Sequence, residues 1–535
     1  MGRFWVPVAI TVSIFITAVI SPASTHYIAA NGNDTNSGTS KSAPWLHAPG
    51  MPACAGNCGA YTPAPGDSFI FRGGDTWHFG NRTASPYTGG TWAWGWSGTS
   101  GNVIYVGVDQ TWYNGGSWVR PVLTADNPTS TNAVSSCLYH AGSSNGMVNL
   151  YPVRYVTFDN FELTGFCWDN TANANYIVGY GGAVPGYQNP FTIENLYLHG
   201  WTHTTAGTQA GASGLTGYNQ NYGVTLQYNV IDGSDSDHYS LQPLGQGGDT
   251  YFFQYNIIRH VGGTSVSNTC HIAHDNLFEY IYNVTDSSTH TDIYMCYGEA
   301  GAPNFPGDGT PNLFYNNVFR NIPGAVSYVF AEFPPPNYTD YVFNNIFHDY
   351  GGNATNYNPI CEDGTCGAVV LFNNTFEASL PNYVGCIECN LTDPRMTAVN
   401  NHWITNAGSN ASAVFTNTNS PFVESYPVYQ TYNVATSQGY NSANDFAPTS
   451  SSSATVGAGN NQTNGFCARL QNSAAQAACI QGTTAACGYN TSTHAVNCPA
   501  VIPVPRPSNG AWDVGAFQFG GTQNRPAPPS NLTAH

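Results

Sequence analysis

A short motif, an asparagine followed by apolar residues, recurs along the middle of the chain. Typical copies read FDNFELTGF (158–166), QYNIIRHVG (254–262) and FNNIFHDYG (343–351). The anchoring residues are Asn160, Asn195, Asn229, Asn256, Asn276, Asn317, Asn345 and Asn374, with Asn401 as a weaker ninth copy. The copies are short β-rich runs between turn-rich segments, without helical periodicity. Repeated at this spacing, they predict stacked coils of a parallel β-solenoid.

Stacking places equivalent side chains of successive coils above one another, about 4.8 Å apart. We therefore expect the nine asparagines to form one hydrogen-bonded ladder at a turn, with the apolar residues after them filling the interior. The anchors lie 20 to 41 residues apart. The longest interval, from Asn276 to Asn317, suggests a further divergent coil near residues 293–299.

Three segments resemble a known family. HYIAANGNDTNSGTSKSAPW (26–45), GDSFIFRGGDTW (66–77) and WDVGAFQF (512–519) resemble the opening, first coil and closing segment of secreted proteins of the pectate-lyase-like superfamily. The resemblance spans about residues 26–520. It implies an all-β fold, a right-handed single-stranded parallel β-helix with about 10 or more coils and loop insertions. That superfamily contains polysaccharide lyases, glycoside hydrolases, uronate epimerases and non-catalytic surface proteins, so the fold leaves the activity open.

The ends of the chain differ from the repeats. Residues 1–24 carry a positive start, an apolar run and small residues before Ser24, which predicts a signal peptide and secretion. Residues 25–520 are assigned to the β-helix, with an irregular, cysteine-rich wrap or cap over 405–520. We expect a short helix within 466–482. Residues 521–535 form a Pro-rich tail, part of which resembles the first strand of a fibronectin type III domain.

Composition restricts the partners. Of 535 residues only 8% are charged, Lys41 is the one lysine, and the formal net charge is −18. A nucleic-acid footprint requires clustered basic residues, which this chain lacks. No apolar stretch after the signal is long enough to span a membrane. A polyanionic substrate would need a bridging cation or a local arginine site. The sequence does not define the oligomeric state.

Fourteen cysteines in an exported chain indicate disulfides. Close pairs are Cys54/Cys58, Cys361/Cys366 and Cys386/Cys389, and four more lie at Cys467, Cys479, Cys487 and Cys498. The C-x-x-C spacing of Cys386 and Cys389 leaves a zinc site as an alternative. The disulfide connectivity does not follow from the sequence.

Two columns of the repeat carry polar side chains in the central coils. Three residues after the anchors stand Leu163, Leu198, Asp232, Arg259, Glu279, Arg320, His348 and Glu377; two residues before them stand Phe158, Ile193, Gln227, Gln254, His274, Tyr315, Phe343 and Phe372. Charges of alternating sign at coil spacing favour either a surface salt-bridge ladder or a substrate groove. In the groove interpretation Gln227, Gln254, His271, His274 and Arg320 bind substrate.

The longest loops hold the candidate catalytic groups. Asp237 and His238 follow one repeat, and His290, Asp292 and Glu299 lie in another loop. Paired carboxylates serve as general acid and base in glycoside hydrolysis. Alternatively, Asp232 and Asp235 hold Ca²⁺ on a uronate while Arg259 or a histidine removes a proton.

The sequence therefore favours a secreted enzyme, a polysaccharide lyase or glycoside hydrolase, acting over coils 227–320. The leading acid–base candidates are Asp237, His290 and Asp292. The sequence departs from the superfamily's signatures, because the Gly-His-Gly, Arg-Ile-Lys and Asp-Pro-His-Asp motifs are absent. A non-catalytic glycan-binding, adhesive or filament-forming protein is the alternative.

Overall fold

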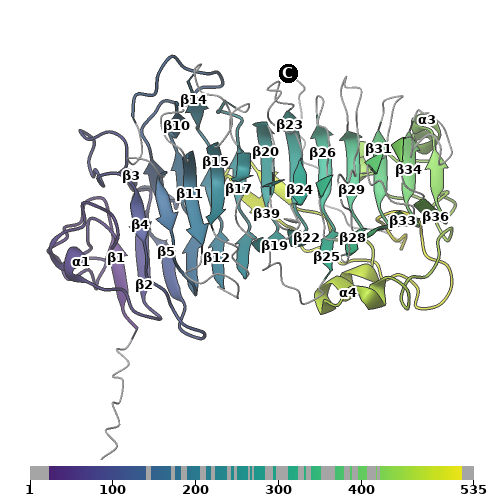
Figure 1. Cartoon of the computed structure of the whole chain (residues 1–535), viewed down its shortest axis with the longest axis horizontal. Helices are drawn as coiled ribbons and strands as arrows, with labels where there is room; N and C mark the ends of the chain where they lie inside the picture. The colour runs from purple at the N-terminus through teal and green to yellow at the C-terminus, as the bar shows by residue number, and fades with distance from the viewer. Residues whose placement is uncertain are drawn as a thin grey trace, which may run out of the picture.

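The computed structural model describes residues 23–139, 146–169, 175–181, 190–204, 212–218, 223–237, 242–245, 250–262, 266–267, 270–282, 293–296, 311–322, 331–332, 339–350, 368–378, 386–387, 396–405, 417–418 and 422–520. Within these ranges the chain winds into an elongated solenoid of three parallel sheets (Figure 1). Parallel strands joined by such crossovers coil right-handedly. The right-handed parallel β-helix expected from the repeat and from the family resemblance is confirmed.

Sheet A has 13 strands and sheet B has 12, both entirely parallel. Sheet A consists of β1 (Thr25–Ile28), β2 (Ser68–Gly73), β5 (Ile104–Tyr113), β8 (Val156–Asp159), β12 (Phe191–Glu194), β16 (Val224–Gln227), β19 (Thr250–Gln254), β22 (Cys270–His274), β25 (Asn312–Tyr315), β28 (Thr339–Phe343), β30 (Ala368–Phe372), β33 (Met396–Val399) and β36 (Phe422–Ser425). Sheet B consists of β3 (Thr76–His78), β6 (Val122–Thr124), β9 (Glu162–Thr164), β13 (Tyr197–Leu198), β17 (Val230–Asp232), β20 (Ile257–Gly262), β23 (Leu277–Tyr282), β26 (Val318–Ile322), β29 (Ile346–Tyr350), β31 (Thr375–Ala378), β34 (His402–Thr405) and β37 (Val428–Gln430).

Sheet C and three two-stranded sheets complete the β structure. Sheet C consists of β4 (Trp92–Trp94), β7 (Val148–Leu150), β11 (Asn175–Gly181), β15 (Ala212–Tyr218), β18 (Gln242–Gly245), β21 (Val266–Ser267), β24 (Tyr294–Cys296) and β27 (Ala331–Glu332). The parallel pairs are β10 (Cys167–Trp168) with β14 (Thr202–His203), and β32 (Cys386–Ile387) with β35 (Asn417–Thr418). The hairpin β38 (Gly488–Asn490) and β39 (Ala495–Asn497) is antiparallel. The helices are short: α1 (Gly56–Ala60), α3 (Tyr432–Ser437), α4 (Ser473–Cys479) and the 3₁₀ turns η1 (Ser442–Asn444) and η2 (Cys467–Arg469).

The turn between sheets A and B holds the asparagine ladder. Asn345 is fully buried; its Oδ1 accepts from the Asn317 backbone N at 2.9 Å, and its Nδ2 donates to the Phe314 carbonyl at 2.9 Å and to Asn374 Oδ1 at 3.1 Å. The same contacts link Asn229, Asn256, Asn276, Asn317, Asn345, Asn374 and Asn401. Each amide thus supplies the hydrogen bonds that water would make to the backbone of an exposed turn and that a tight, buried turn would otherwise lack.

Two of the nine predicted ladder positions are wrong. Asn160 and Asn195 have φ angles of 69° and 56°, and they occupy the left-handed turn position one residue before the ladder. Leu196, not Asn195, faces the ladder, because its backbone N donates to Asn229 Oδ1. Left-handed positions favour asparagine over most other residues, which explains why the single asparagine of each of these two turns looks like an anchor.

The predicted extra coil between Asn276 and Asn317 is also wrong. Strand β22 pairs directly with β25, and the two asparagines are hydrogen-bonded neighbours on the ladder. The segment near 293–299 instead contributes β24 to sheet C of the same coil. The 41-residue interval is therefore one coil with long connections.

Aromatic rings stack along the interior in register with the coils. Phe278, Phe319, Phe347, Phe376 and Trp403 follow one another with centroid distances of 4.3 to 4.9 Å. All five are buried in one continuous core that extends to the N-terminal coils. Trp92 and Trp94 belong to that core as well.

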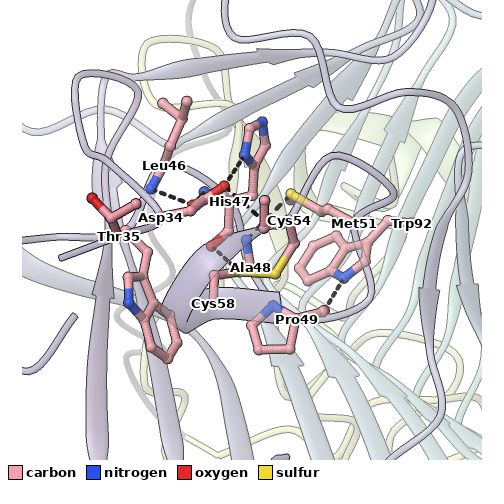
Figure 2. The surroundings of a disulfide bond; sticks show 12 residues. Asp34, Thr35, Leu46, His47, Ala48, Pro49, Met51, Cys54, Cys58 and Trp92 are labelled. Carbon is pink, nitrogen blue, oxygen red and sulfur yellow. Dashed lines mark hydrogen bonds and ion pairs between the residues drawn. A yellow bond between two sulfur atoms is a disulfide. The ribbon is translucent and has the colours of Figure 1, made fainter. Parts of the chain in front are cut away.

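A compact loop closes the N-terminal end. Asp34 Oδ1 accepts from the backbone N of Leu46 and of His47, and its Oδ2 lies 2.7 Å from His47 Nδ1. Figure 2 shows this carboxylate beside the Cys54–Cys58 disulfide. Burial opposes the charge on Asp34, but the bonds to His47 outweigh it and lower the pKa of the carboxyl. The loop is held by this polar centre together with Trp45, Ala48 and Met51, which pack in the core.

Residues 431–520, called the C-terminal wrap below, return along the outside of the solenoid. In Figure 1 this yellow-green segment runs back from the far end to β39, near the middle coils. Helix α4 and Trp512 pack with the outer face of sheet A, while Ala485 and Phe517 pack with the outer face of sheet B. Disulfides Cys467–Cys479 and Cys487–Cys498 brace the wrap, as the cysteine crowding and the helix expected within 466–482 suggested.

The left-handed turn asparagines hold the wrap in place. Asn316 Nδ2 donates to Thr484 Oγ1 at 2.6 Å, Asn344 Nδ2 to the Ala478 carbonyl at 3.0 Å, and Asn400 Nδ2 to the Asn460 carbonyl at 2.8 Å. In these three N-N copies the first asparagine therefore bonds the wrap and the second belongs to the ladder.

We predict that Asn345→Ala lowers the free energy of unfolding by about 1–3 kcal/mol, because it leaves buried donors and acceptors of two coils unsatisfied. Urea unfolding followed by circular dichroism measures the change. The exposed Asn509 provides the control, since Asn509→Ala should change stability by less than about 0.5 kcal/mol. Equal effects of the two substitutions would contradict a stabilising ladder.

Candidate functional site

The predicted substrate-binding residues of sheet A form one hydrogen-bonded ladder. Gln227 Nε2 donates to Glu194 Oε2 at 2.6 Å, and Gln254 Nε2 donates to Gln227 Oε1 at 2.8 Å. His274 continues the ladder, with Nε2 2.8 Å from Gln254 Oε1 and Nδ1 2.8 Å from Asp275 Oδ2. Because the Glu194 carboxylate accepts only, it fixes the orientation of both amides. Burial raises the pKa of Glu194, which its bond from Gln227 opposes.

This amide ladder lies at the border of the C-terminal wrap. Thr484 Oγ1 of the wrap donates to Asp275 Oδ1 at 2.9 Å, and the column continues beyond His274 as the stacked rings of Tyr315, Phe343 and Phe372. Those three rings pack in the cluster that α4 covers. Gln227 and Gln254, in contrast, remain half-buried. The polar half of the column is therefore the half that the wrap leaves open.

The charged column of sheet B also stacks in register. Arg259 Nε lies 3.3 Å from Glu279 Oε1 and its Nη1 lies 3.8 Å from Asp232 Oδ2; Arg320 Nε donates to Glu279 Oε2 at 3.1 Å. The Glu279 side chain is 6% exposed, so these are not surface pairs. Tyr489 of the wrap lies over the Arg259 guanidinium at 4.4 Å. The predicted ladder of charges thus exists, but the wrap covers it.

His199 belongs to the charged column of sheet B, one coil before Asp232. The sequence alignment missed it because the anchor of that coil was placed one residue too early, at Asn195. His199 Nδ1 lies 2.8 Å from Asp235 Oδ2 and its Nε2 lies 3.1 Å from Glu162 Oε1. Burial opposes the imidazolium charge, but hydrogen bonds to the two carboxylates outweigh it and raise the pKa of His199 to about 9. The ring of Tyr197 stacks between His199 and His494 at 4.2 and 4.5 Å. Aligning the column one residue later would have found His199.

Asp237 forms a second pair with a histidine. Its carboxylate Oδ2 lies 2.7 Å from His203 Nδ1; the Asp237 side chain is 3% exposed and that of His203 is 12% exposed. Asp237 follows β17, and His203 ends β14 on the preceding coil. The main chain is held as well, because the Asp237 backbone N donates to the Trp201 carbonyl and Trp201 Nε1 donates to the Asp237 carbonyl. A buried carboxylate in this position orients the imidazole.

Several predicted site residues lie outside the described residues: His238, His290, Asp292 and Glu299. The backbone of His271 lies in β22, and its side chain is also outside the described part. Their proposed roles stay predictions, as do those of the residues that the structure places.

The two predicted calcium ligands are each engaged by a cation. Asp232 lies beside Arg259, and Asp235 is bonded to His199. Among the described residues no group of three or more His, Cys, Asp or Glu side chains is arranged to hold a metal. These two carboxylates therefore do not fit a shared calcium cage, and we assign no step to the ion.

No helix in the described ranges is long and apolar enough to cross a membrane.

Comparison with known proteins gives no family model and no curated protein that matches the chain. Solved structures of similar architecture include the pectate lyase Pel9A, with 16% identity and a TM-score of 0.36 over 94% of this chain and 98% of that one. The GH136 lacto-N-biosidase from Eubacterium ramulus has 11% identity and a TM-score of 0.37 over 76% and 68%. XylC in complex with xylose has 10% identity and a TM-score of 0.39 over 74% and 70%. Likeness at this level concerns general architecture and does not define activity.

We predict that Glu279→Gln destabilises the fold by about 3–5 kcal/mol, because it leaves two mostly buried guanidinium groups without their shared anion. Thermal and urea unfolding measure the loss. Asp109→Asn is the matched control: it removes the anion of the exposed Lys41–Asp109 pair and should cost less than about 1 kcal/mol. Similar small losses for both variants would mean that the sheet B column behaves as an ordinary surface ladder.

A pH dependence follows from His199. Because its pKa in the folded protein is raised from 6.5 to about 9, its contribution to stability is complete below pH 6.5 and is lost as the pH rises through about 9. Urea unfolding of the wild type and of His199→Gln between pH 6 and 10 isolates this contribution. The difference in unfolding free energy between the two proteins should shrink across that window; a constant difference would refute the ionised pair.

Proposed function

We propose that this chain is a secreted carbohydrate-active enzyme that cleaves an extracellular polysaccharide by acid–base chemistry at His203 and Asp237. The observation that carries the proposal is the 2.7 Å contact between the Asp237 carboxylate and His203 Nδ1. Asp237 was a leading acid–base candidate from the sequence. The Asp237 side chain is more deeply buried than that of His203. We therefore assign Asp237 to positioning the ring, and the His203 imidazole to proton transfer.

The chemistry follows from the two nitrogens of the ring. Because the Asp237 carboxylate lies 2.7 Å from Nδ1, we assign Nε2 of His203 as the nitrogen that takes up or releases a proton. Such a group serves as the base that removes a proton beside a carboxylate in a lyase, or as the general acid–base of a hydrolase. In both cases the carboxylate stabilises the imidazolium that forms.

Compartment and substrate class rest on other features. The four disulfides among the described residues, Cys54–Cys58, Cys137–Cys167, Cys467–Cys479 and Cys487–Cys498, suit an oxidising compartment. The substrate class is taken from the resemblance of segments 26–45, 66–77 and 512–519 to secreted polysaccharide-acting proteins. The pectate lyase and the lacto-N-biosidase named above define the reactions to test first.

A non-catalytic glycan-binding or structural protein is the second candidate. The specific observation in its favour is that Arg259 and Arg320 both pair with Glu279 and that Tyr489 covers Arg259. In that case glycan binding should occur without product formation.

We predict that His203→Gln and Asp237→Asn each lower the rate of polysaccharide cleavage by about 10²–10⁴-fold, the usual contribution of a general acid–base group. The assay incubates the purified mature chain with neutral and uronate polysaccharides, with calcium or chelator, and follows reducing ends and unsaturated products. Unsaturation identifies a lyase, and reducing ends alone identify a hydrolase.

The control is His78→Gln, which removes the imidazole of the similar His78–Asp126 pair on an N-terminal coil and should leave the rate unchanged. Circular dichroism and melting temperatures show whether each variant is folded. Full activity in both folded site variants would exclude this pair. Binding without products from the wild type would favour the non-catalytic protein.

A further inference from the structure

A cavity of about 760 Å³ lies between sheet B and the C-terminal wrap. Its lining includes Arg320 from β26, and Asp445, Thr483, Tyr489, Asn497 and Gln518 from the wrap. Cavities of about 300–1,000 Å³ that combine apolar walls with a few polar groups are typical ligand sites. Prolines of the 499–505 segment supply part of the apolar wall. This cavity is distinct from the His203–Asp237 pair.

Arg320 offers a preorganised hydrogen-bonding fork to the cavity. Glu279, buried beneath it, accepts from Arg320 Nε at 3.1 Å and thereby fixes the plane of the guanidinium. Neither Nη nitrogen of Arg320 makes a hydrogen bond to a residue that the structure describes, and the side chain is 20% exposed. Glu279, with the nearby charge of Asp445, raises the pKa of Arg320 despite burial. Arg259, one coil earlier, is instead enclosed by Tyr489, Asp232 and Glu279.

We propose that this cavity binds a uronate residue of an acidic glycan through its carboxylate, held by the two Nη groups of Arg320. A planar guanidinium whose Nη groups make no hydrogen bond within the described residues can pair with a carboxylate bidentately. The chain has a formal net charge of −18, so it repels a polyanion unless a local arginine receives it. The inference rests on the proposed function for the choice of a glycan as ligand, and it places that glycan's anchor away from the reacting pair.

Asp445 sets the selectivity of the cavity. Its Oδ1 lies 3.3 Å from His348 Nε2, and its side chain is 22% exposed. As an anion near Arg320 it weakens the attraction for a carboxylate while accepting a hydrogen bond from a sugar hydroxyl. Replacing it with the isosteric asparagine removes the repulsion and keeps the shape of the wall.

The test is NMR titration with methyl galacturonoside and methyl glucuronoside, against the corresponding neutral methyl hexosides. The wild type should bind at least one uronoside at least 10-fold more tightly than its neutral counterpart. Arg320→Gln should abolish this preference, Arg320→Lys should reduce it because an ammonium cannot bind bidentately, and Asp445→Asn should increase it. Arg469→Gln, which removes an arginine positioned over Phe466, is the charge-matched control and should bind as the wild type does.

The inference is overturned if the wild type shows no preference for either uronoside, or if folded Arg320→Gln retains the preference. If Arg320→Gln does not fold, Arg320→Lys and Asp445→Asn provide the test. The preference for the uronoside must fall in Arg320→Lys and rise in Asp445→Asn. His203→Gln separates this inference from the proposed function. That variant should bind uronosides normally while cleavage is lost. Arg320-dependent binding without any cleavage in the wild type would leave the cavity site standing and exclude the enzyme.

Discussion

The buried turn between sheets A and B is the constraint on which the rest of the solenoid depends. Two residues must turn the chain from sheet A into sheet B between packed coils, where no water is available to the backbone groups. The asparagine amide solves this at Asn229 and six later coils by bonding upward and downward at once. Since each amide serves two coils, the ladder fixes the register of both sheets. Every column of side chains on the outer faces is a consequence of that register.

The regular register of the coils explains which contacts could be predicted from the sequence alone. Gln227, Gln254 and His274 were found as one column because a local motif repeats, and the structure bonds them to one another. Arg259 and Arg320 were found in the same way, and the structure pairs each of them with Glu279. The alignment slipped by one residue in the coils near 160 and 195, where an asparagine occupies the left-handed position and an apolar residue faces the ladder. Because of this one-residue error, His199 was not recognised as a member of the charged column.

The partners that define the sites could not be found in this way. Tyr489, His494, Asp445 and Thr484 lie in the C-terminal wrap, far along the chain from the coils they contact. The wrap has no period, so no column aligns it with the strands beneath. His203 was missed because a single histidine beyond a repeat has no local signal, although its partner Asp237 was selected for its acidic loop. Long-range packing, rather than local propensity, decides these contacts.

The left-handed turn position also helps to hold the wrap on the solenoid. At Asn316, Asn344 and Asn400 the side chain at this position bonds the wrap, whereas Asn195 at the same position bonds Asp159 of the preceding coil. Where this position is tyrosine, at Tyr228 and Tyr255, the two rings stack on each other at 4.9 Å and remain half-buried. The amide ladder of Gln227 and Gln254 lies beside these tyrosines, on coils before Asp275, which accepts a hydrogen bond from Thr484 of the wrap. The side chain at this position of the repeat therefore helps to bind the C-terminal wrap in several later coils, while the coils of Tyr228 and Tyr255 keep a half-buried polar column on sheet A.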